Sequence, residues 1–564
     1  MSLISRTKNI AKNSDIVMRL YRNARLRNSQ PELPLGSETE LGQIEKTNGK
    51  ILIATSVGSH IPGTMMECYL SAALALRGHA IDVLLCDSVL PACQACVSKN
   101  IANIEKFAKS GPQNVVCSGC FTHARNTFRK TGAGVLKYSD YINEIQLESS
   151  KQIASEIGVD DIRRFKLDDI SVGEHAFAGA VRFFARNDIE NEPTGTLVLK
   201  RYLAAAIITK IVMESLLRAS KYDVVVFHHG IYVPQGIVGE VCRKHGTRVV
   251  NWNPAYKSGC FIFSHDDSYH HTMISEPVDS WVNIPWTEAK ERVLDDYLKS
   301  RMKGTNDWIW FHENPDFDAD NSMERLGIDM ERPIIGLLSN VVWDAQLHYS
   351  SNAFGSMLDW IHKTIEYFID RQDLQLLIRV HPAEVNGSIP ARQRVADEVM
   401  RRFSVLPENV VVVGPQDTAS TYSLMSKCDA VTIFNTKTGI ELSAIGIPVI
   451  VCGEAWIRNK GFGVDVSDEE TYYEVLDSLP WNRKLDDSKQ LLAKKYAFHF
   501  FFRRMIPIGA FSSRRNKALI GPYEFEMDTV DRMKPGVDLG TDTICKGIVE
   551  AAPFVYKAEE RFEA

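Results

Sequence analysis

The chain has 564 residues, a formal net charge of −6, 45% hydrophobic residues and 24% charged residues. A chain of this length is expected to hold two or three domains, and its balanced charge excludes a general nucleic-acid-binding surface. It contains no run of about eighteen uncharged apolar residues, and its N-terminus lacks an apolar signal-peptide core. The sequence therefore predicts a cytoplasmic protein without a spanning helix.

The first 47 residues are predicted to form a basic helix and a polar linker. Arginine and lysine outnumber acids over residues 1–30, where an apolar stripe is formed by Ile10, Ile16, Val17, Leu20 and Tyr21. Such a helix can lie peripherally on the inner face of the cell membrane, or it can pack on the protein through its apolar side. The pattern leaves both interpretations open.

Residues 48–320 and 330–480 each show strands alternating with helices. In the first region, strands are predicted at 50–57, 80–86, 222–227 and 248–252. In the second, strands are predicted at 333–338, 374–380, 409–413, 429–434 and 448–452, and helices at 357–369, 419–426 and 439–445. This alternation predicts an α/β fold with two Rossmann-like, doubly wound domains. Residues 481–564 are expected to form a helical tail, whose aromatic run 496–504 is either core or a membrane contact.

The residues after each strand of the second domain are candidates for a binding site, because ligands of open α/β sheets bind beyond the carboxyl ends of the strands. Strand 374–380 contains Arg379 and is followed by His381 and Pro382. A histidine held by the following proline can donate a hydrogen bond to a phosphate oxygen. A simple turn is the alternative interpretation of a His-Pro pair.

Strand 429–434 is followed by small polar residues at the start of a helix, which is a favourable place for an anion. The candidate donor-binding residues here are Asn435, Thr436, Lys437, Thr438, Gly439 and Glu441. Helix capping by Asn435 or Thr438 is the alternative, and it is compatible with phosphate binding. The loop after strand 448–452 adds Glu454 and Lys460, and this loop can close over a charged donor or stay solvated.

The chain has no Walker A sequence and no glycine-rich dinucleotide fingerprint after the first strand of either domain, which argues against NTPases and typical dehydrogenases. Four segments resemble the capsule polysaccharide biosynthesis family, namely His381-Pro382, Asn435–Leu442, Gly446–Ile450 and Arg458–Gly461. Members of that family are glycosyltransferases of the GT-B type, and some transfer 3-deoxy-manno-octulosonic acid from a CMP-linked donor. The His-Pro element also resembles that of bacterial sialyltransferases, where it meets the nucleotide phosphate.

The resemblance implies two domains facing a central cleft, with residues 48–320 binding the acceptor and residues 330–480 binding a CMP- or UDP-linked sugar. The expected acceptor is a growing cell-surface polysaccharide or a glycolipid, and no catalytic metal or other cofactor is expected. An inverting reaction would use His229 or Glu240 as the base, and a retaining one Asp344 or Glu384. The alternatives are a nucleotide-sugar epimerase, a polyol-phosphate transferase and a non-catalytic nucleotide-sugar-binding protein.

Four of the eleven cysteines form two Cys-x-x-Cys pairs, Cys93 with Cys96 and Cys117 with Cys120. In a reducing compartment this spacing is typical of a tetrahedral, structural zinc site, here within an insertion of the first domain. An iron–sulfur cluster and four unligated thiols are the alternatives.

Overall fold

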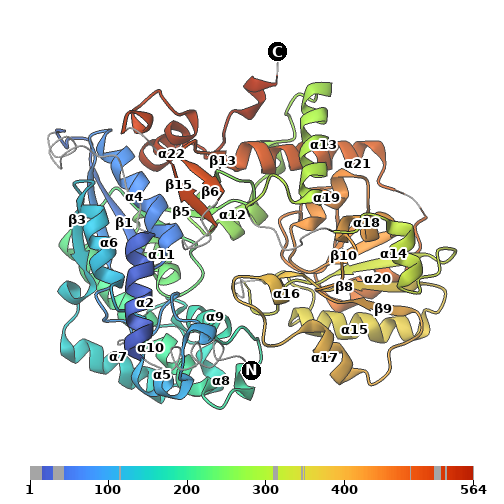
Figure 1. Ribbon diagram of the computed structural model, residues 1–564, viewed down its shortest axis with the longest axis horizontal. Coiled ribbons are helices and arrows are strands. Elements are labelled where there is room, and N and C mark those ends of the chain that lie inside the picture. The colour runs from blue at the N-terminus through green and yellow to red at the C-terminus, as the bar shows by residue number, and fades with distance from the viewer. Residues whose placement is uncertain are drawn as a thin grey trace. The chain divides into compact units, whose positions relative to one another are not determined.

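The computed structural model describes residues 15–29, 44–112, 116–308, 315–344, 347, 350–482, 484–513, 522–526 and 530–562. The chain divides into two compact units. Unit 1 comprises Met1–Phe184, Asp188–Tyr269 and Arg504–Tyr556, and unit 2 comprises Ala185–Asn187, His270–Arg503 and Lys557–Ala564. Each unit has its own largely parallel sheet with helices packed around it (Figure 1). This confirms the predicted α/β fold with two doubly wound domains.

Unit 1 is built on a seven-stranded sheet in the order β13-β6-β5-β4-β1-β2-β3. β1 and β4 in its centre are almost wholly buried, as expected for parallel strands that helices cover on both faces. β6 runs antiparallel to β5, and β13 runs antiparallel to β6. The strands are β1 (Lys50–Ser56), β2 (Ala80–Leu85), β3 (Gly134–Lys137), β4 (Val224–His228), β5 (Arg248–Pro254), β6 (Cys260–His265) and β13 (Ile506–Pro507).

The helices of unit 1 begin and end at recognisable local signals. The side chain of His60 accepts a hydrogen bond from the backbone of Gly63 at the start of α4, and Gly78 with a φ of 82° follows the end of that helix. The helices are α2 (Asp15–Asn28), α4 (Ile61–Ala75), α5 (Ile104–Ser110), α6 (Cys120–Arg129), α7 (Glu144–Glu156), α8 (Val159–Ile162), α9 (Val172–Phe184), α10 (Gly195–Ala219), α11 (Gln235–Lys244) and α22 (Leu539–Glu550). A two-stranded sheet joins β14 (Phe511–Ser513) to β15 (Tyr523–Phe525).

Unit 2 is built on a six-stranded parallel sheet in the order β12-β11-β10-β7-β8-β9. Its strands are β7 (Ile334–Leu338), β8 (Gln375–Arg379), β9 (Val410–Val413), β10 (Ala430–Ile433), β11 (Val449–Val451) and β12 (Val464–Asp465). Its helices are α12 (Tyr269–Ser275), which starts on the last residue of unit 1, α13 (Glu288–Lys303), α14 (Ala319–Arg325), α15 (Met357–Asp370), α16 (Ala383–Asn386), α17 (Val395–Arg402), α18 (Thr421–Ser426), α19 (Thr438–Ala444), α20 (Glu469–Asp477) and α21 (Asp487–Phe498). α15 and α17 lie together on one side of the sheet, and α19 and α21 lie on the other (Figure 1).

The compact units divide the chain differently from the expected boundaries at 320 and 481. Residues from His270 onward join unit 2, because α13 packs on α21 and its Arg301 pairs with Glu441 of α19. Residues 504–556 of the expected tail join unit 1, because β13 extends its sheet and Thr541 of α22 hydrogen-bonds Tyr69 of α4. The expected tail is therefore shared between the two units.

The aromatic run 496–504 belongs to the core of its unit. Tyr496, Phe498, Phe500 and Phe501 are fully buried, and the Tyr496 hydroxyl donates a hydrogen bond to the Trp456 carbonyl, 2.7 Å away. Of the two interpretations of this run, the structure supports core packing.

Candidate functional site

Three neighbouring strands of unit 2 end in polar residues that hydrogen-bond to one another. Ser339 and Asn340 follow β7, His381 follows β8, and Asn435 follows β10. The backbone N–H of His381 donates to Ser339 Oγ at 3.0 Å, and Asn340 Nδ2 donates to Asn435 Oδ1 at 3.3 Å. We call these residues, with Thr436 and Thr438, the strand-end site. Since β10, β7 and β8 are adjacent in the sheet, the polar residues that follow these strands lie together at its carboxyl edge.

His381 is held in one orientation by the turn that follows it. The backbone N–H of Ala383 donates to His381 Nδ1 at 3.0 Å, and Pro382 precedes the first residue of α16 with a φ of −58°. Because Nδ1 accepts a hydrogen bond, the ring proton of the neutral imidazole is on Nε2. This nitrogen is then the donor suited to an anionic oxygen.

Two threonine hydroxyls stand at the start of α19. Thr436 Oγ1 accepts a hydrogen bond from the backbone N–H of Thr438 at 3.4 Å and lies 3.3 Å from Thr438 Oγ1. Gly439 packs closely, since a Cβ there would lie 2.7 Å from Ile433 Cδ1 and 2.8 Å from Ile457 Cδ1, and these side chains would have to shift. The structure thus brings Thr436 and Thr438 to the edge of the sheet beside Asn435.

Lys437 and Glu441 point into a buried cluster of charges. Glu441 accepts hydrogen bonds from Lys437 Nζ and Arg301 Nε, each at 2.8 Å, and from the Tyr422 hydroxyl. Arg301 also pairs with Asp307. Burial raises the pKa of Glu441, but the charges of Arg301 and Lys437 outweigh burial and hold this pKa below its usual value. Two cations face two carboxylates here, so the charge of Lys437 is already balanced within the protein.

Arg379 and Glu384 hold loops in place. Two guanidinium nitrogens of Arg379 donate to the carbonyls of Gly414, Asp417 and Ala419 after β9, and burial lowers its pKa to about 10. Glu384 accepts from the Val395 backbone N–H at 2.8 Å, and burial raises its pKa to about 7.

Lys460 and Glu454, expected in a closing loop, are also engaged with backbone groups. Lys460 Nζ donates to the carbonyls of Ile274 at 2.9 Å and Glu276 at 2.6 Å, and burial lowers its pKa to about 8. Glu454 Oε1 accepts from the Ser351 N–H at 2.7 Å. The loop after β11 is therefore fixed to two other segments of unit 2.

Comparison with protein families gives one match, over the part of the chain that contains the strand-end site. Residues 311–485 match the capsule polysaccharide biosynthesis protein family. This confirms the resemblance expected from the His-Pro and Asn-Thr motifs. No curated protein matches the chain.

Several solved structures overlay on the chain at low similarity. The beta Kdo 2,4 transferase KpsC of Thermosulfurimonas dismutans has 11% identity and a TM-score of 0.34, covering 56% of this chain and 87% of that one. The beta Kdo 2,7 transferase KpsC of the same organism has 12% identity and a TM-score of 0.31, covering 57% and 88%. A UDP-GlcNAc 2-epimerase from Neisseria meningitidis has 11% identity and a TM-score of 0.21, covering 79% and 94%. Overlays at these TM-scores do not show a shared function.

Two of the four catalytic candidates, Asp344 and His229, follow strands of different units. Asp344 is in the turn after Asn340, where its N–H donates to the Val341 carbonyl at 3.4 Å. His229 follows β4 with a φ of 67°, and its N–H donates to the Trp252 carbonyl at 2.9 Å. Asp344 therefore shares a loop with the strand-end site, whereas His229 stands at the carboxyl end of a unit 1 strand.

The carboxylate of Glu240 on α11 contacts His175 of α9 and the backbone of Ser171, the residue that precedes α9. Its carboxylate oxygens lie 3.0 Å from His175 Nε2 and 2.7 Å from the Ser171 N–H, which donates to it. His175 Nδ1 also faces an acceptor, the Ile231 carbonyl, at 2.6 Å. Glu240 and the Ile231 carbonyl therefore hold the His175 ring from both of its nitrogens.

A buried acid in unit 1 was missed by the sequence analysis. Glu67 of α4 is fully buried, accepts a hydrogen bond from Trp252 Nε1 at 3.1 Å, and has its pKa raised to about 7 by burial. Beside it, the rings of His60 and His228 are 4.6 Å apart. Glu67 is the single charged residue in the stretch 65–76, and this feature of the sequence could have indicated a buried acid.

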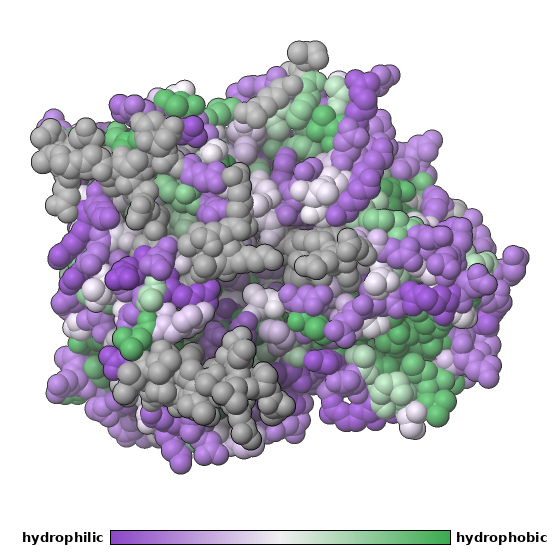
Figure 2. Space-filling model, in the orientation of Figure 1, coloured by the Kyte–Doolittle hydropathy of each residue, from purple (hydrophilic) through white to green (hydrophobic). Residues whose placement is uncertain are grey.

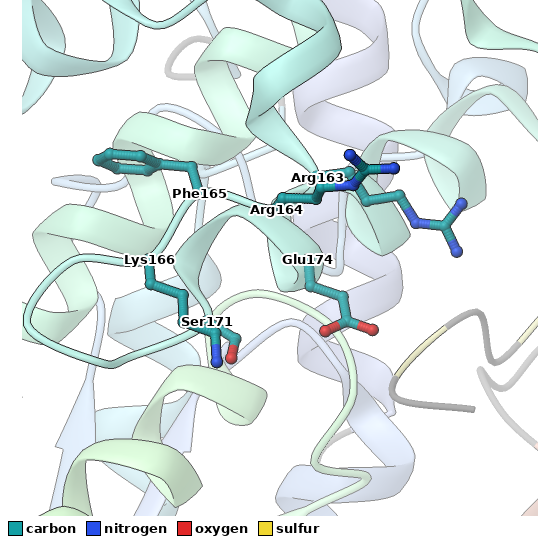
Figure 3. A pocket seen from close by; sticks show the side chains of 6 residues that line it. All are labelled: Arg163, Arg164, Phe165, Lys166, Ser171 and Glu174. Atoms are coloured by element: carbon teal, nitrogen blue, oxygen red, sulfur yellow. The ribbon is translucent and has the colours of Figure 1, made fainter. Parts of the chain in front are cut away.

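A basic surface pocket in unit 1 was also not predicted. It is lined by Arg163, Arg164, Phe165, Lys166, Ser171 and Glu174 (Figure 3). The Phe165 ring points away from the two guanidinium groups, and the Arg163 guanidinium lies 4.8 Å from the Phe177 ring centroid. Three cationic side chains within residues 163–166 are the feature of the sequence that could have indicated this pocket.

The cysteine pairs come together in unit 1. Cys93 Sγ lies 4.0 Å from Cys96 Sγ, and Cys93, Cys117 and Cys120 line one small cavity together with Cys86. In the arrangement seen for the described residues, no three or more His, Cys, Asp or Glu side chains are placed to hold a metal ion.

The basic N-terminal helix is described from residue 15, and residues 1–14, including Ile10, lie outside the described part of the chain. Arg22 and Asn23 of α2 hydrogen-bond the hydroxyls of Ser59 and Ser118, and Leu26 is buried. Leu20 and Tyr21 are 67% and 57% exposed.

The visible face of the molecule is mostly hydrophilic (Figure 2). Within the described residues, no helix has the length and apolarity needed to cross a bilayer.

Proposed function

We propose that the protein is a glycosyltransferase that moves a sugar from a nucleotide-activated donor to a cell-surface polysaccharide or glycolipid. The observation that supports this most is the strand-end site, where the ends of β7, β8 and β10 are joined by hydrogen bonds of Ser339 and Asn340. The family match over residues 311–485 supports the same proposal. The donor is proposed to be linked to CMP or UDP.

In this proposal the site stabilises the nucleotide as it leaves. Negative charge develops on the phosphate when the sugar bond breaks, and oriented donors placed there lower the barrier. His381 Nε2 and the hydroxyls of Thr436 and Thr438 are the proposed donors. The protein holds these donors in position before the substrate arrives. We propose that they stabilise the phosphate charge, and we assign no metal ion to this step.

In this proposal, five charged residues support the site without contacting the ligand. They are Arg379, Lys437, Glu441, Glu454 and Lys460. Their charged groups are bonded to loop carbonyls, to a backbone N–H or to one another. They fix the loops after β9, β10 and β11 instead of meeting the phosphate.

The attacking hydroxyl of the acceptor must lose its proton, and we propose His229 or Asp344 as the base. The carboxylates of Glu240 and Glu384 accept backbone N–H hydrogen bonds. We propose His229 for an inverting reaction and Asp344 for a retaining one. Analysis of the anomeric configuration of the product decides between the two routes.

Calorimetry with CMP, UDP and GDP, followed by product analysis with a labelled donor, tests the proposal. His381→Ala is expected to weaken nucleotide binding about 10- to 100-fold, the effect of losing a hydrogen bond to a charged group. The control is His362→Ala on α15, which removes the same side chain from beside Phe403. A free epimer or a phosphodiester product would indicate the alternative enzymes, and binding of no nucleotide would contradict the proposal.

We also propose that the protein acts at the cytoplasmic face of the membrane, with Leu20 and Tyr21 of α2 entering the interface. Their exposure supports this, and Arg19 and Arg27 flank them with positive charge. Flotation with vesicles containing anionic lipid tests it. Leu20→Ser with Tyr21→Ser should reduce binding, and equal binding by the wild type and this variant would contradict it.

A further inference from the structure

We propose that Cys93, Cys96, Cys117 and Cys120 bind one zinc ion, which joins the loop after β2 to the start of α6. This inference does not depend on the proposed glycosyl transfer. It rests on the positions of the four thiols in unit 1 and on the cation that faces them.

The first pair already has a suitable spacing. Cys93 and Cys96 lie in the loop after β2, and their sulfur atoms are 4.0 Å apart. A tetrahedral zinc ion with Zn–S bonds of about 2.3 Å requires sulfur atoms about 3.8 Å apart. These two thiols therefore need little movement to share one ion.

The second pair lines the same cavity from another element. Cys120 is the first residue of α6, and Cys117 precedes it in the turn. Both face the small cavity that Cys93 also lines, whose remaining wall includes Ser56 and Ser59 from the end of β1. The Ser59 backbone N–H donates to Cys120 Sγ at 3.2 Å, and such donors stabilise the charge of a thiolate ligand.

A cation beside the cavity suits a negatively charged site. Four thiolates around Zn²⁺ leave a net charge of about −2, which is costly to bury alone. Arg22 of α2 donates from Nη2 to Ser59 Oγ at 3.0 Å, and its buried Nε has no hydrogen-bond partner among the described residues. Its charge also acts on Cys93, Cys117 and Cys120. The guanidinium therefore offsets part of the thiolate charge.

Binding requires the second pair to turn toward the first, since no three thiols of the described residues are placed to share an ion as they stand. A change of rotamer about the Cα–Cβ bond moves a cysteine sulfur by roughly 3 Å. Each of the four thiols releases its proton to solvent as its sulfur binds, and Zn²⁺ undergoes no change of oxidation state. No redox partner is needed.

The test measures metal bound to the full chain, purified under reducing conditions without added metal. Mass spectrometry of the elements should find about one zinc ion per chain and almost no iron. Titration of the thiols with a mercurial should release the zinc to a chromogenic chelator. After exchange for Co²⁺, the protein should show the absorption of a tetrahedral thiolate site.

Cys93→Ser and Cys117→Ser, one from each pair, should each reduce bound zinc at least tenfold. The controls are Cys86→Ser, which alters the same cavity outside both pairs, and Cys428→Ser in unit 2, and both should keep the zinc. The cobalt spectrum of the wild type keeps the test valid where a variant fails to fold. Zinc below a tenth of an ion per chain, a disulfide, iron with visible cluster absorption, or loss of zinc in Cys86→Ser would each overturn the proposal.

Discussion

Arg301 and Glu441 form a buried ion pair in unit 2, with 2.8 Å between the guanidinium Nε and a carboxylate oxygen. The pair joins α13 to α19, and the first residue of α19, Thr438, belongs to the strand-end site. Because Lys437 and Asp307 complete the cluster, its charges are balanced inside the protein. The carboxylate of Glu441 is thus engaged by Arg301 and Lys437 within the protein.

Removing that carboxylate should destabilise the fold. Glu441→Ala leaves two buried cations beside one remaining acid, and breaking a buried pair in this way costs about 3–5 kcal/mol of unfolding free energy. Urea denaturation measures the loss. The control is Glu366→Ala, which removes the half-exposed partner of Arg402 and should cost less than about 1 kcal/mol. Weaker nucleotide binding at unchanged stability would instead make Glu441 a ligand-binding residue.

The buried carboxyl of Glu67 should make stability depend on pH. Its pKa is raised from 4.5 to about 7 in the fold, so the unfolded chain releases its proton first as the pH rises. The wild type should lose about 3 kcal/mol relative to Glu67→Gln between pH 4.5 and pH 7, with no further change above. Denaturation of both proteins at pH 5 and pH 8 measures this difference. A constant difference across that range contradicts the prediction. The nearby imidazoles, whose pKa values burial lowers, are common to both proteins.

A methyl group at Gly453 should disturb the end of β10. Its Cβ would lie 2.4 Å from the Phe434 carbonyl oxygen, a backbone atom that cannot rotate away. Gly453→Ala should cost about 1–3 kcal/mol and weaken nucleotide binding, because Phe434 precedes Asn435 of the site. Gly414→Ala is the matched control, since no atom of the described residues lies within 4 Å of its added Cβ. Equal stability of the two variants would show that the loop adapts.

Glu240→Ala should separate a structural role from a catalytic one. The substitution leaves His175 and the Ser171 N–H without their carboxylate, which should cost about 1.5–3 kcal/mol of stability. Turnover per folded molecule should stay near the wild-type value, whereas His229→Ala should lower it if the reaction is inverting. Thermal unfolding combined with kcat measures both effects. Lost turnover at full stability would identify Glu240 as the base.

The sequence predicted the interior of both sheets because their strands are apolar runs bounded by turns. The predicted run 333–338 became β7 (Ile334–Leu338), and 374–380 became β8 (Gln375–Arg379). β6 and β13 were not predicted, since their place depends on pairing between residues 261 and 506. Local pattern does not encode such pairing.

The chemistry of the site was predicted less completely than its position. His381 and Asn435 were identified from their places after strands. The partner of Glu441 is Arg301, 140 residues earlier in the chain, and no periodicity indicates that pair. Likewise, Lys460 was expected to face a ligand, but it bonds the carbonyls of Ile274 and Glu276. Whether a side chain meets a ligand or a distant backbone depends on tertiary packing.

Because β13 and α22 complete unit 1 from residues 504–556, a ribosome has made all of the continuous segment His270–Arg503 before unit 1 has its last strand. In the growing chain, the edge of β6 that later pairs with β13 therefore stays unpaired while unit 2 emerges from the exit tunnel. Translation arrested near residue 503 should leave the earlier domain unfinished and prone to aggregation or chaperone binding, although most of its residues have already been made.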